Sequence, residues 1–188
     1  LPKPYFFAFR FACEHYGLLT QVPTTIHVAL KRLKRPMELK NVRFEFVVLT
    51  PKRFFGFEEI TILGEKIQVS DLERTVLDAL DRPELVGGIE ASIQVLFHAA
   101  KKADYAKLLG YLKRMDDRAL ARRFGYLADQ LKLELPKELS QYLRAQVNKN
   151  PAYLGSPARW GKDGQRDSSW NLIINVPKQE LLGEVRIG

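Results

Sequence analysis

Cysteine, histidine and long apolar runs are scarce in this chain of 188 residues. Cys13 is the only cysteine, so an internal disulfide and a cysteine-based metal cage are both excluded. No apolar stretch approaches the roughly 18 to 20 residues that a membrane-spanning helix needs. These absences predict a cytoplasmic protein that makes no membrane contact.

Motifs of the common enzyme classes are missing as well. The three histidines, His15, His27 and His98, stand alone, without H-x-x-x-H spacing and without a neighbouring cysteine or carboxylate cluster. G-x-S-x-G, P-loop and G-x-G-x-x-G sequences do not occur, so acyl transfer and nucleotide chemistry lack their usual scaffolds. We therefore expect no catalytic residues, no metal site, no cofactor and no enzymatic activity.

The composition is that of a folded, basic protein. Hydrophobic residues make up 46% of the chain, and we expect a single domain over residues 1–188. Thirty Lys and Arg residues against 22 Asp and Glu residues give a net charge of +8. This excess favours association with phosphate backbones or with an acidic partner.

The first third of the chain, residues 1–69, reads as one helix followed by strands. Apolar residues at helical spacing, closed by Gly17, predict a short helix over residues 4–16. Alternating or β-branched runs predict strands over residues 25–30 and 43–50. A further hairpin is expected to pair residues 59–63 with 66–69 across Gly64, so this part forms a curved antiparallel sheet or half barrel.

Residues 70–147 read as helices. Ser70 and Glu73 form an S-x-x-E capping box, which predicts a helix that starts at Asp71 and ends before Pro83. The spacing places Leu72, Val76 and Leu80 on the buried face and turns the charged side chains towards the other side. Those charged residues are Arg74, Asp78 and Asp81. Four further apolar stripes, the last opened by Pro136, predict helices as far as residue 147.

The last part, residues 148–188, reads as a long loop that is rich in glycine and proline, followed by a strand over residues 170–176. The order of strands first and helices later favours an α+β fold over an alternating one. We therefore predict a small antiparallel β-sheet followed by a helical bundle, with the C-terminal strand returning to the sheet.

Two basic clusters are candidates for nucleic-acid contact. Lys31, Arg32, Lys34 and Arg35 place four cations within five residues, a density that would neutralise several phosphates. A solvated hairpin loop explains the same residues equally well. Lys52 and Arg53 precede three phenylalanines, a combination found in single-strand binders. Phenylalanines this close together are also typical of core anchors.

The C-terminal loop is a third candidate. Arg159, Trp160, Lys162 and Arg166 combine cations and an aromatic ring with flexible glycines, so this loop could hold a partner or a nucleic acid. Pairing of its arginines with Asp163 and Asp167 would explain the composition without any ligand. Trp160 fits an exposed recognition residue and a lid on the core equally well.

A metal-dependent nuclease is the enzymatic alternative. Glu38-Leu39-Lys40 has the acidic-x-Lys spacing that, on a strand, could place a metal-binding carboxylate beside a water-activating lysine. Asp71 or Asp78 would then supply a second ligand. The triplet lies between Pro36 and Asn41, which indicates a turn between strands rather than the middle of one.

Five segments of this chain, in the expected order, resemble the AbiEi-type antitoxins of prokaryotic abortive-infection and toxin-antitoxin systems. The main ones are residues 70–78 (SDLERTVLD) and 81–90 (DRPELVGGIE). The others are residues 15–18 with Gln21-Val22-Pro23, residues 51–56, and residues 167–172 with Asn175-Val176-Pro177. Members of that family usually open with a winged helix-turn-helix, which is not recognisable here, so we expect this chain to be a fragment or a trimmed form.

The resemblance implies a non-enzymatic transcriptional regulator that counteracts a nucleotidyltransferase-type toxin, either directly or through the target of the toxin. DNA is the second implied partner, recognised by the missing winged helix and contacted at its backbone by the basic loops of this chain. A nucleic-acid-binding module without an antitoxin role remains the principal alternative.

Overall fold

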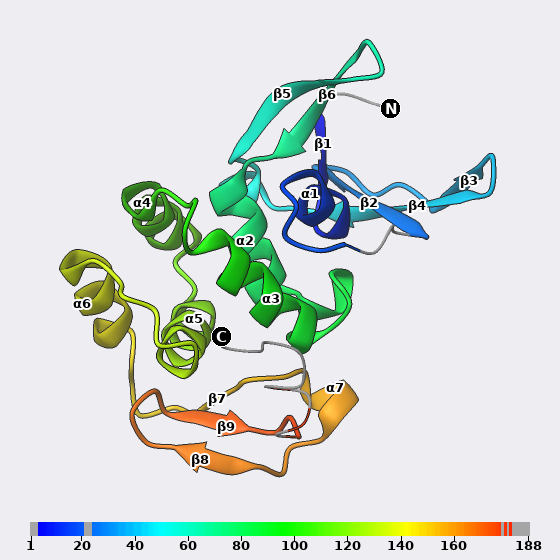
Figure 1. The fold of residues 1–188 in the computed structure, drawn as a ribbon. Helices are drawn as coiled ribbons and strands as arrows, with labels where there is room; N and C mark the ends of the chain where they lie inside the picture. The colour runs from blue at the N-terminus through cyan, green and yellow to red at the C-terminus, as the bar shows by residue number, and fades with distance from the viewer. Residues whose placement is uncertain (1–3, 21–23, 178, 180, 182–188) are drawn as a thin grey trace.

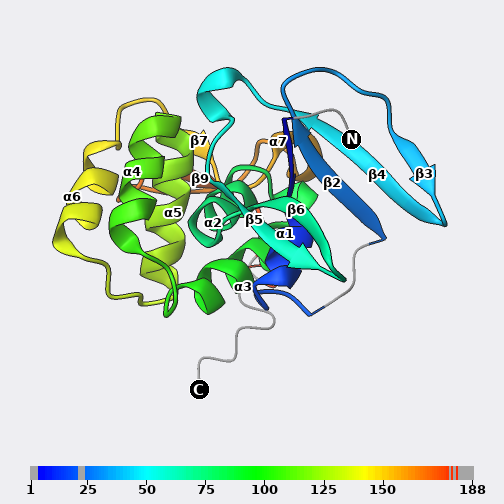
Figure 2. The same ribbon diagram turned by 90° about the horizontal axis from the view of Figure 1, so that it is seen from above.

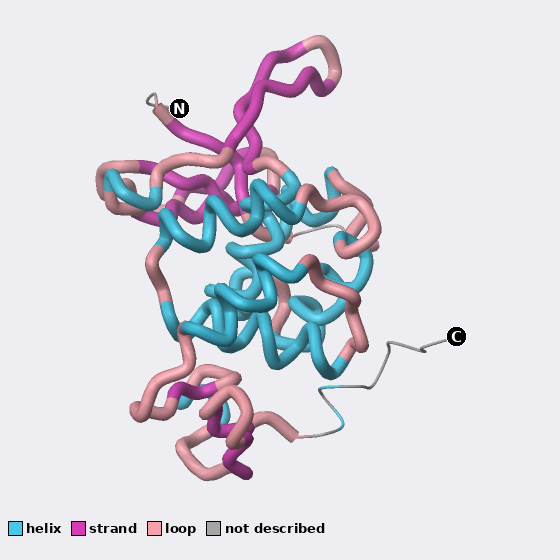
Figure 3. Tube along the Cα trace, turned by 90° about the vertical axis from the view of Figure 1, so that its left-hand side faces the viewer, coloured by secondary structure: helices cyan, strands magenta, loops and turns pink. Residues whose placement is uncertain are grey.

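The structure, a computed structural model, describes residues 4–20, 24–177, 179 and 181. It has three tiers, with a six-stranded sheet at one end, helices in the middle and a small three-stranded sheet at the other end (Figures 1 and 3). The predicted α+β class is confirmed. Gln21, Val22 and Pro23, which contribute to the family resemblance, lie outside the described residues.

The N-terminal segment differs from the prediction of a helix over residues 4–16. Residues Tyr5–Ala8 form strand β1, and only Arg10–His15 form a helix, α1. Phe9 separates them with a φ of 56°, which turns the chain sharply. Aromatic residues favour strands, and β1 gains two partners from distant parts of the chain, so tertiary pairing outweighs the helical spacing.

The large sheet has the strand order β3-β4-β2-β1-β6-β5. Its other members are β2 (Thr25–Leu30), β3 (Met37–Leu39), β4 (Val42–Val48), β5 (Phe57–Ile62) and β6 (Glu65–Ser70). Adjacent β5 and β6 form the predicted antiparallel hairpin. The sheet is nevertheless mixed, because β2 pairs with β4 and β1 pairs with β6 in parallel. The hairpin of β3 and β4 lets β4 run alongside β2 in the same direction, so the prediction of a purely antiparallel sheet was wrong.

The helices follow the sheet as predicted. They are α2 (Leu72–Asp81), α3 (Ile89–Ala99), α4 (Tyr105–Met115), α5 (Arg118–Gln130) and α6 (Lys137–Ala145), with 3₁₀ turns at Pro51–Arg53 (η1) and Pro83–Leu85 (η2). Helix α2 is central, because it packs against α1, α3, α4 and α5 (Figure 1). Within the described part of the chain, every helix is too short or too polar to cross a bilayer.

The C-terminal strand does not return to the large sheet, which corrects the prediction. Strand β9 (Leu172–Ile174) instead lies between β7 (Ala152–Tyr153) and β8 (Gln165–Asp167), and the short helix α7 (Pro157–Trp160) joins the last two. Two arginines of α5, in the helical tier, hydrogen-bond to this second sheet and the segment before it. Arg122 donates to the carbonyl of Asn150 at 2.8 Å, and Arg123 donates to the carbonyl of Tyr153 at 3.0 Å. The second sheet therefore completes the core of the helices.

Trp170 is the main anchor between the second sheet and α5. Its ring lies directly over Gly125, where an added Cβ would come within 2.1 Å of the ring. Its indole N–H donates to Asp129 at 2.7 Å, and the Arg144 guanidinium stacks on the ring at 3.8 Å. The absence of a side chain at position 125 is thus a packing requirement.

Gly125→Ala is expected to destabilise the protein by about 1 to 3 kcal/mol, because the new methyl group displaces Trp170 from a packed core. Gly110→Ala is the matched control, since Gly110 also lies within a helix but has open space at its Cβ position. There alanine should stabilise the protein by about 0.5 to 1 kcal/mol through helix propensity. Urea unfolding of both variants tests this, and equal effects at the two glycines would contradict the packing described.

Candidate nucleic-acid interface

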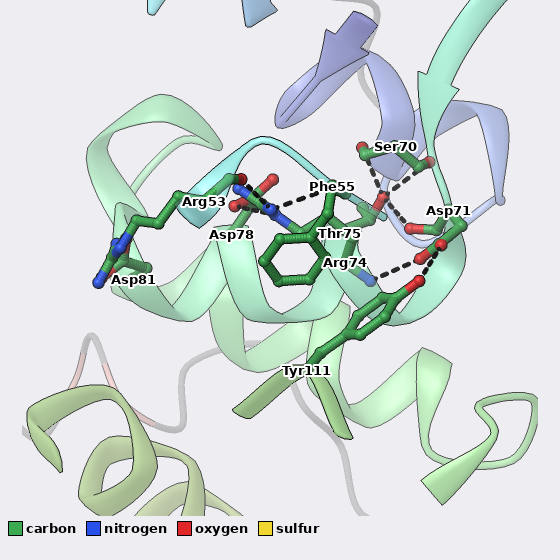
Figure 4. Close-up of polar contacts among 9 residues, drawn as sticks. All are labelled: Arg53, Phe55, Ser70, Asp71, Arg74, Thr75, Asp78, Asp81 and Tyr111. Atoms are coloured by element: carbon green, nitrogen blue, oxygen red, sulfur yellow. Dashed lines mark hydrogen bonds and ion pairs between the residues drawn. The ribbon is translucent and has the colours of Figure 1, made fainter. Parts of the chain in front are cut away.

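The segment of residues 70–81 builds a rigid scaffold at the centre of the fold (Figure 4). Asp71 caps α2, because its carboxylate accepts from the Arg74 amide at 2.9 Å and from the Tyr111 hydroxyl at 2.7 Å. Ser70 is the last residue of β6, paired with Phe57, so it cannot cap the helix as predicted. Its hydroxyl instead bonds to that of Thr75 at 2.9 Å. The helix therefore begins one residue later than the capping box indicated.

The charged side of α2 is buried rather than turned outward, which corrects a second prediction. Arg74 is 1% exposed, and its Nε lies 2.8 Å from Oδ1 of Asp78. Its Nη1 donates to the carbonyls of Arg53 and Phe55 at 2.6 and 3.0 Å (Figure 4). Because the segment after β4 crosses α2, these carbonyls supply acceptors that no local pattern reveals. Burial raises the pKa of Asp78, and the adjacent guanidinium opposes this shift.

Glu73 and Lys107 tie α4 to the start of α2. The Lys107 ammonium lies 2.8 Å from Glu73 and 3.2 Å from Asp71, and Glu73 also accepts from the Asp104 amide at 2.9 Å. Burial raises the pKa of Tyr111 to about 12, and its hydrogen bond to Asp71 adds to this shift. The acidic residues of the motif therefore have structural partners.

The basic residues after β4 also face acids. Arg53 lies 2.6 Å from Asp81 and 2.8 Å from Asp117, which is the N-cap of α5, and Lys52 lies 3.3 Å from Asp116. Phe54 and Phe55 are buried core residues. The core-anchor interpretation thus holds for these phenylalanines, and the charge of Arg53 is compensated within the fold.

Arg53→Ala is expected to lower the free energy of unfolding by about 1 to 3 kcal/mol at neutral pH, because two charged hydrogen bonds are lost. Burial alone would raise the pKa of Asp117, but the Leu120 amide and Arg53 lower it overall. A carboxyl with a lowered pKa stabilises the fold above its unfolded pKa of about 3.9, and the gain vanishes as pH falls through the folded pKa. The deficit of the variant should therefore shrink below about pH 4, and a pH-independent deficit in urea unfolding would contradict these pairs.

The cation loop, residues 31–35, differs from these paired cations. Lys31, Arg32 and Arg35 are exposed, and Lys34 is half-buried. The Lys31 ammonium lies 4.9 Å from the centre of the Phe54 ring, and that of Lys34 lies 4.7 Å from the centre of the Phe46 ring. Over the residues that the structure describes, none of the four cations has an acidic partner within 4.0 Å. Their charge is thus available to an external anion.

The C-terminal loop lies elsewhere, at the end of the molecule that carries the small sheet (Figure 1). Arg166 donates to the Asn171 side chain at 2.9 Å, and Arg159 stacks on Trp160 at 4.8 Å, while Lys162 is exposed. Trp160 is half-buried and packs against the core, where it lines a pocket of about 250 Å³ with η2 and the start of α3. The structure therefore does not bring this loop together with the cation loop.

The residues of the nuclease alternative are not brought together either. Glu38 is exposed on the edge strand β3, opposite Arg43 of β4. Lys40 and Asn41 both have positive φ, at 48° and 63°, and form the predicted turn between strands. Asp71 caps α2 and Asp78 lies on it, each with the partners given above, and no group of three potential metal ligands occurs within the described ranges.

A solved structure shares this fold. The RV2827C protein from Mycobacterium tuberculosis matches 89% of this chain with a TM-score of 0.62 and 16% sequence identity. This chain spans 61% of the length of that protein. No protein-family model matches the chain, and no curated protein matches it in sequence. At this identity the likeness establishes a common fold, and function has to be argued from the surfaces of the molecule.

Proposed function

We propose that this chain is the effector domain of an AbiEi-like antitoxin regulator, which contacts the nucleic-acid backbone through the cation loop and transforms no molecule itself. Its partners would be DNA and a nucleotidyltransferase-type toxin, with toxin neutralisation direct or through the target of the toxin. The compartment proposed for this activity is the prokaryotic cytoplasm.

The observation that carries the nucleic-acid part is the uncompensated charge of the cation loop. Lys31, Arg32, Lys34 and Arg35 lack acidic partners among the described residues, whereas Lys52 and Arg53 each have one or more. Cations without acidic partners bind phosphates at little cost, because no ion pair has to be broken first, and they release counterions from the nucleic acid. Lys162 of the C-terminal loop is exposed and would add a secondary contact.

The use of charge inside the fold supports a binding protein over an enzyme. Arg74, Asp78, Asp71 and Glu73 are all buried and serve the packing of α2 against its neighbours. The motif that carries the family resemblance is thus a scaffold for surfaces at the periphery. This arrangement suits a protein that acts by contacting other macromolecules.

Growth rescue tests the antitoxin part. The chain is co-expressed with a growth-arresting nucleotidyltransferase-type toxin, and we expect growth to be restored. Glu38→Ala should rescue as well as the original chain, because the proposed activity needs no metal-binding carboxylate. Failure to rescue, with nucleic-acid binding intact, would favour a binding module without an antitoxin role. Magnesium-dependent cleavage of nucleic acid that Glu38→Ala abolishes would establish the nuclease alternative instead.

A further inference from the structure

One side of the large sheet is apolar, and the core does not cover it. We call this side of β1 to β4 the open face. The strand register places Phe7, Val28 and Phe46 side by side on it, and Phe44 follows two residues from Phe46 along β4. The opposite side carries Phe6, Ala8 and Ala29, which belong to the main core between the sheet and the helices.

The side chains of the open face on β1, β3 and β4 are partly exposed, whereas Val28 and Leu30 of β2 are buried between them. Leu39 is 55% exposed, Val48 42% and Met37 38%, while Tyr5, Phe7 and the two phenylalanines of β4 are half-buried. None of these residues belongs to the main core or packs against it. Figure 2 agrees, because β2, β4 and β3 extend sideways beyond the helical tier. An apolar patch of this kind on a folded protein marks an interaction surface.

Charge is distributed unevenly between the two sides of β4. Arg43 and Glu45 alternate with the phenylalanines and therefore lie on the same side of β4 as the core residue Val47. Glu45 approaches His27 there at 3.6 Å, and the Arg43 side chain is 58% exposed. Along β4 the open face carries only Val and Phe residues. The cation loop adjoins the open face, because the Lys34 ammonium lies over the ring of Phe46. The open face thus combines aromatic rings with a positive rim.

We propose that the open face binds single-stranded nucleic acid, with bases stacked on its partly exposed rings and phosphates held by the cation loop. Residues two apart on a strand are about 6.6 Å apart, so Phe44 and Phe46 offer successive stacking positions. Bases of a duplex are already stacked and paired, so their faces cannot reach these rings, whereas unpaired bases can. The cations complement phosphate, and the aromatic surface complements the base.

This inference rests on the proposed nucleic-acid contact and names the form of nucleic acid that is bound. The sequence predicted a combination of cation and aromatic ring, typical of single-strand binders, at Lys52 and Phe54. The structure places that phenylalanine in the core and presents the pattern at Lys34 and Phe46 instead. A second copy of the chain or an acidic protein on the open face would be a different occupant, and the experiment below separates these cases.

Fluorescence anisotropy tests the proposal with a labelled oligothymidylate of about 15 nucleotides and a duplex of equal length. We expect the single strand to bind more tightly than the duplex. Phe44→Leu keeps the apolar bulk but removes the ring, and it should weaken single-strand binding at least fivefold, as a lost stacking contact of about 1 kcal/mol implies. Duplex binding should not change.

Tyr142→Leu is the matched control, because Tyr142 is also half-buried beside a cation, Lys113 at 5.9 Å, but lies on α6 away from the sheet. It should leave both affinities unchanged. Phe44→Trp preserves a ring and should bind normally, with its additional fluorescence quenched by the single strand. Unchanged midpoints of thermal unfolding would show that the variants are folded.

The outcomes separate this inference from the proposed function. Equal affinity for single strand and duplex, with Phe44→Leu indistinguishable from the original chain, would overturn the open face as a stacking surface and leave the backbone contact standing. Absence of binding to either probe would overturn both. A change of sedimentation coefficient in Phe44→Leu without nucleic acid would identify the open face as a contact between copies of the chain, which also overturns the inference.

Discussion

Replacing Arg74 with methionine is expected to destabilise the protein by about 3 to 5 kcal/mol, the range for removing one partner of a buried ion pair. The substitution removes the donors to the carbonyls of Arg53 and Phe55 and leaves the Asp78 carboxylate buried without its cation. Oδ2 of Asp78 already lacks a hydrogen-bond partner among the described residues, so little can compensate for the loss. Urea unfolding at neutral pH measures the difference.

Two controls accompany the Arg74 experiment, one at a surface arginine and one that replaces both members of the buried pair. Arg118→Met changes an exposed arginine of α5 and should alter stability by less than about 0.5 kcal/mol. The double variant Arg74→Met with Asp78→Leu also removes the unpaired carboxylate. It should recover part of the lost stability, because apolar replacement of a buried ion pair is often tolerated. If the single variant is as stable as the original chain, Arg74 does not organise α2 as described.

Alanine at Lys31, Arg32, Lys34 and Arg35 together should weaken nucleic-acid binding on the order of a hundredfold at low salt. The four cations have no acidic partner among the described residues, so their removal should cost binding and leave stability nearly unchanged. Anisotropy titrations with the labelled oligonucleotide at one low salt concentration measure the effect.

The control for the cation loop keeps the total charge equal. Lys101, Lys132, Lys137 and Lys149 are exposed lysines on other parts of the surface, and their replacement by alanine also removes four positive charges. This variant should bind nucleic acid within a few-fold of the original affinity, because diffuse charge contributes less than direct phosphate contact. Equal losses in the two variants would mean that net charge, rather than the cation loop, attracts the nucleic acid.

Local signals predicted much of the fold. The hairpin of β5 and β6 and the five main helices follow from alternation, turn residues and apolar stripes within short segments. The failures occurred where distant segments decide the outcome. Strand β1 exists because β2 and β6 flank it, and β9 joins β7 and β8 because Arg122, Arg123 and Trp170 fix that sheet against α5.

Long-range contacts also determined what the sequence could indicate about function. The density of positive charge in residues 31–35 was visible, but its availability depends on the absence of neighbouring acids in space. Arg53 looked similar in sequence, yet Asp81 and Asp117, 28 and 64 residues away, neutralise it. The alternation of Phe44 and Phe46 with Arg43 and Glu45 indicated a two-sided strand. It could not reveal that Val47, on the side of Arg43 and Glu45, packs into the main core, whereas the two phenylalanines do not.

The salt dependence of nucleic-acid binding tests the central claim most directly, because it counts the phosphates that the protein neutralises. We predict that log K falls linearly with log salt for the original chain, and that alanine at the four cations makes the slope shallower by about 2 to 3 units, as a loss of up to four single-strand phosphate contacts implies. The variant with four distant lysines replaced should keep the original slope. Identical slopes for the original chain and the cation-loop variant would contradict the account.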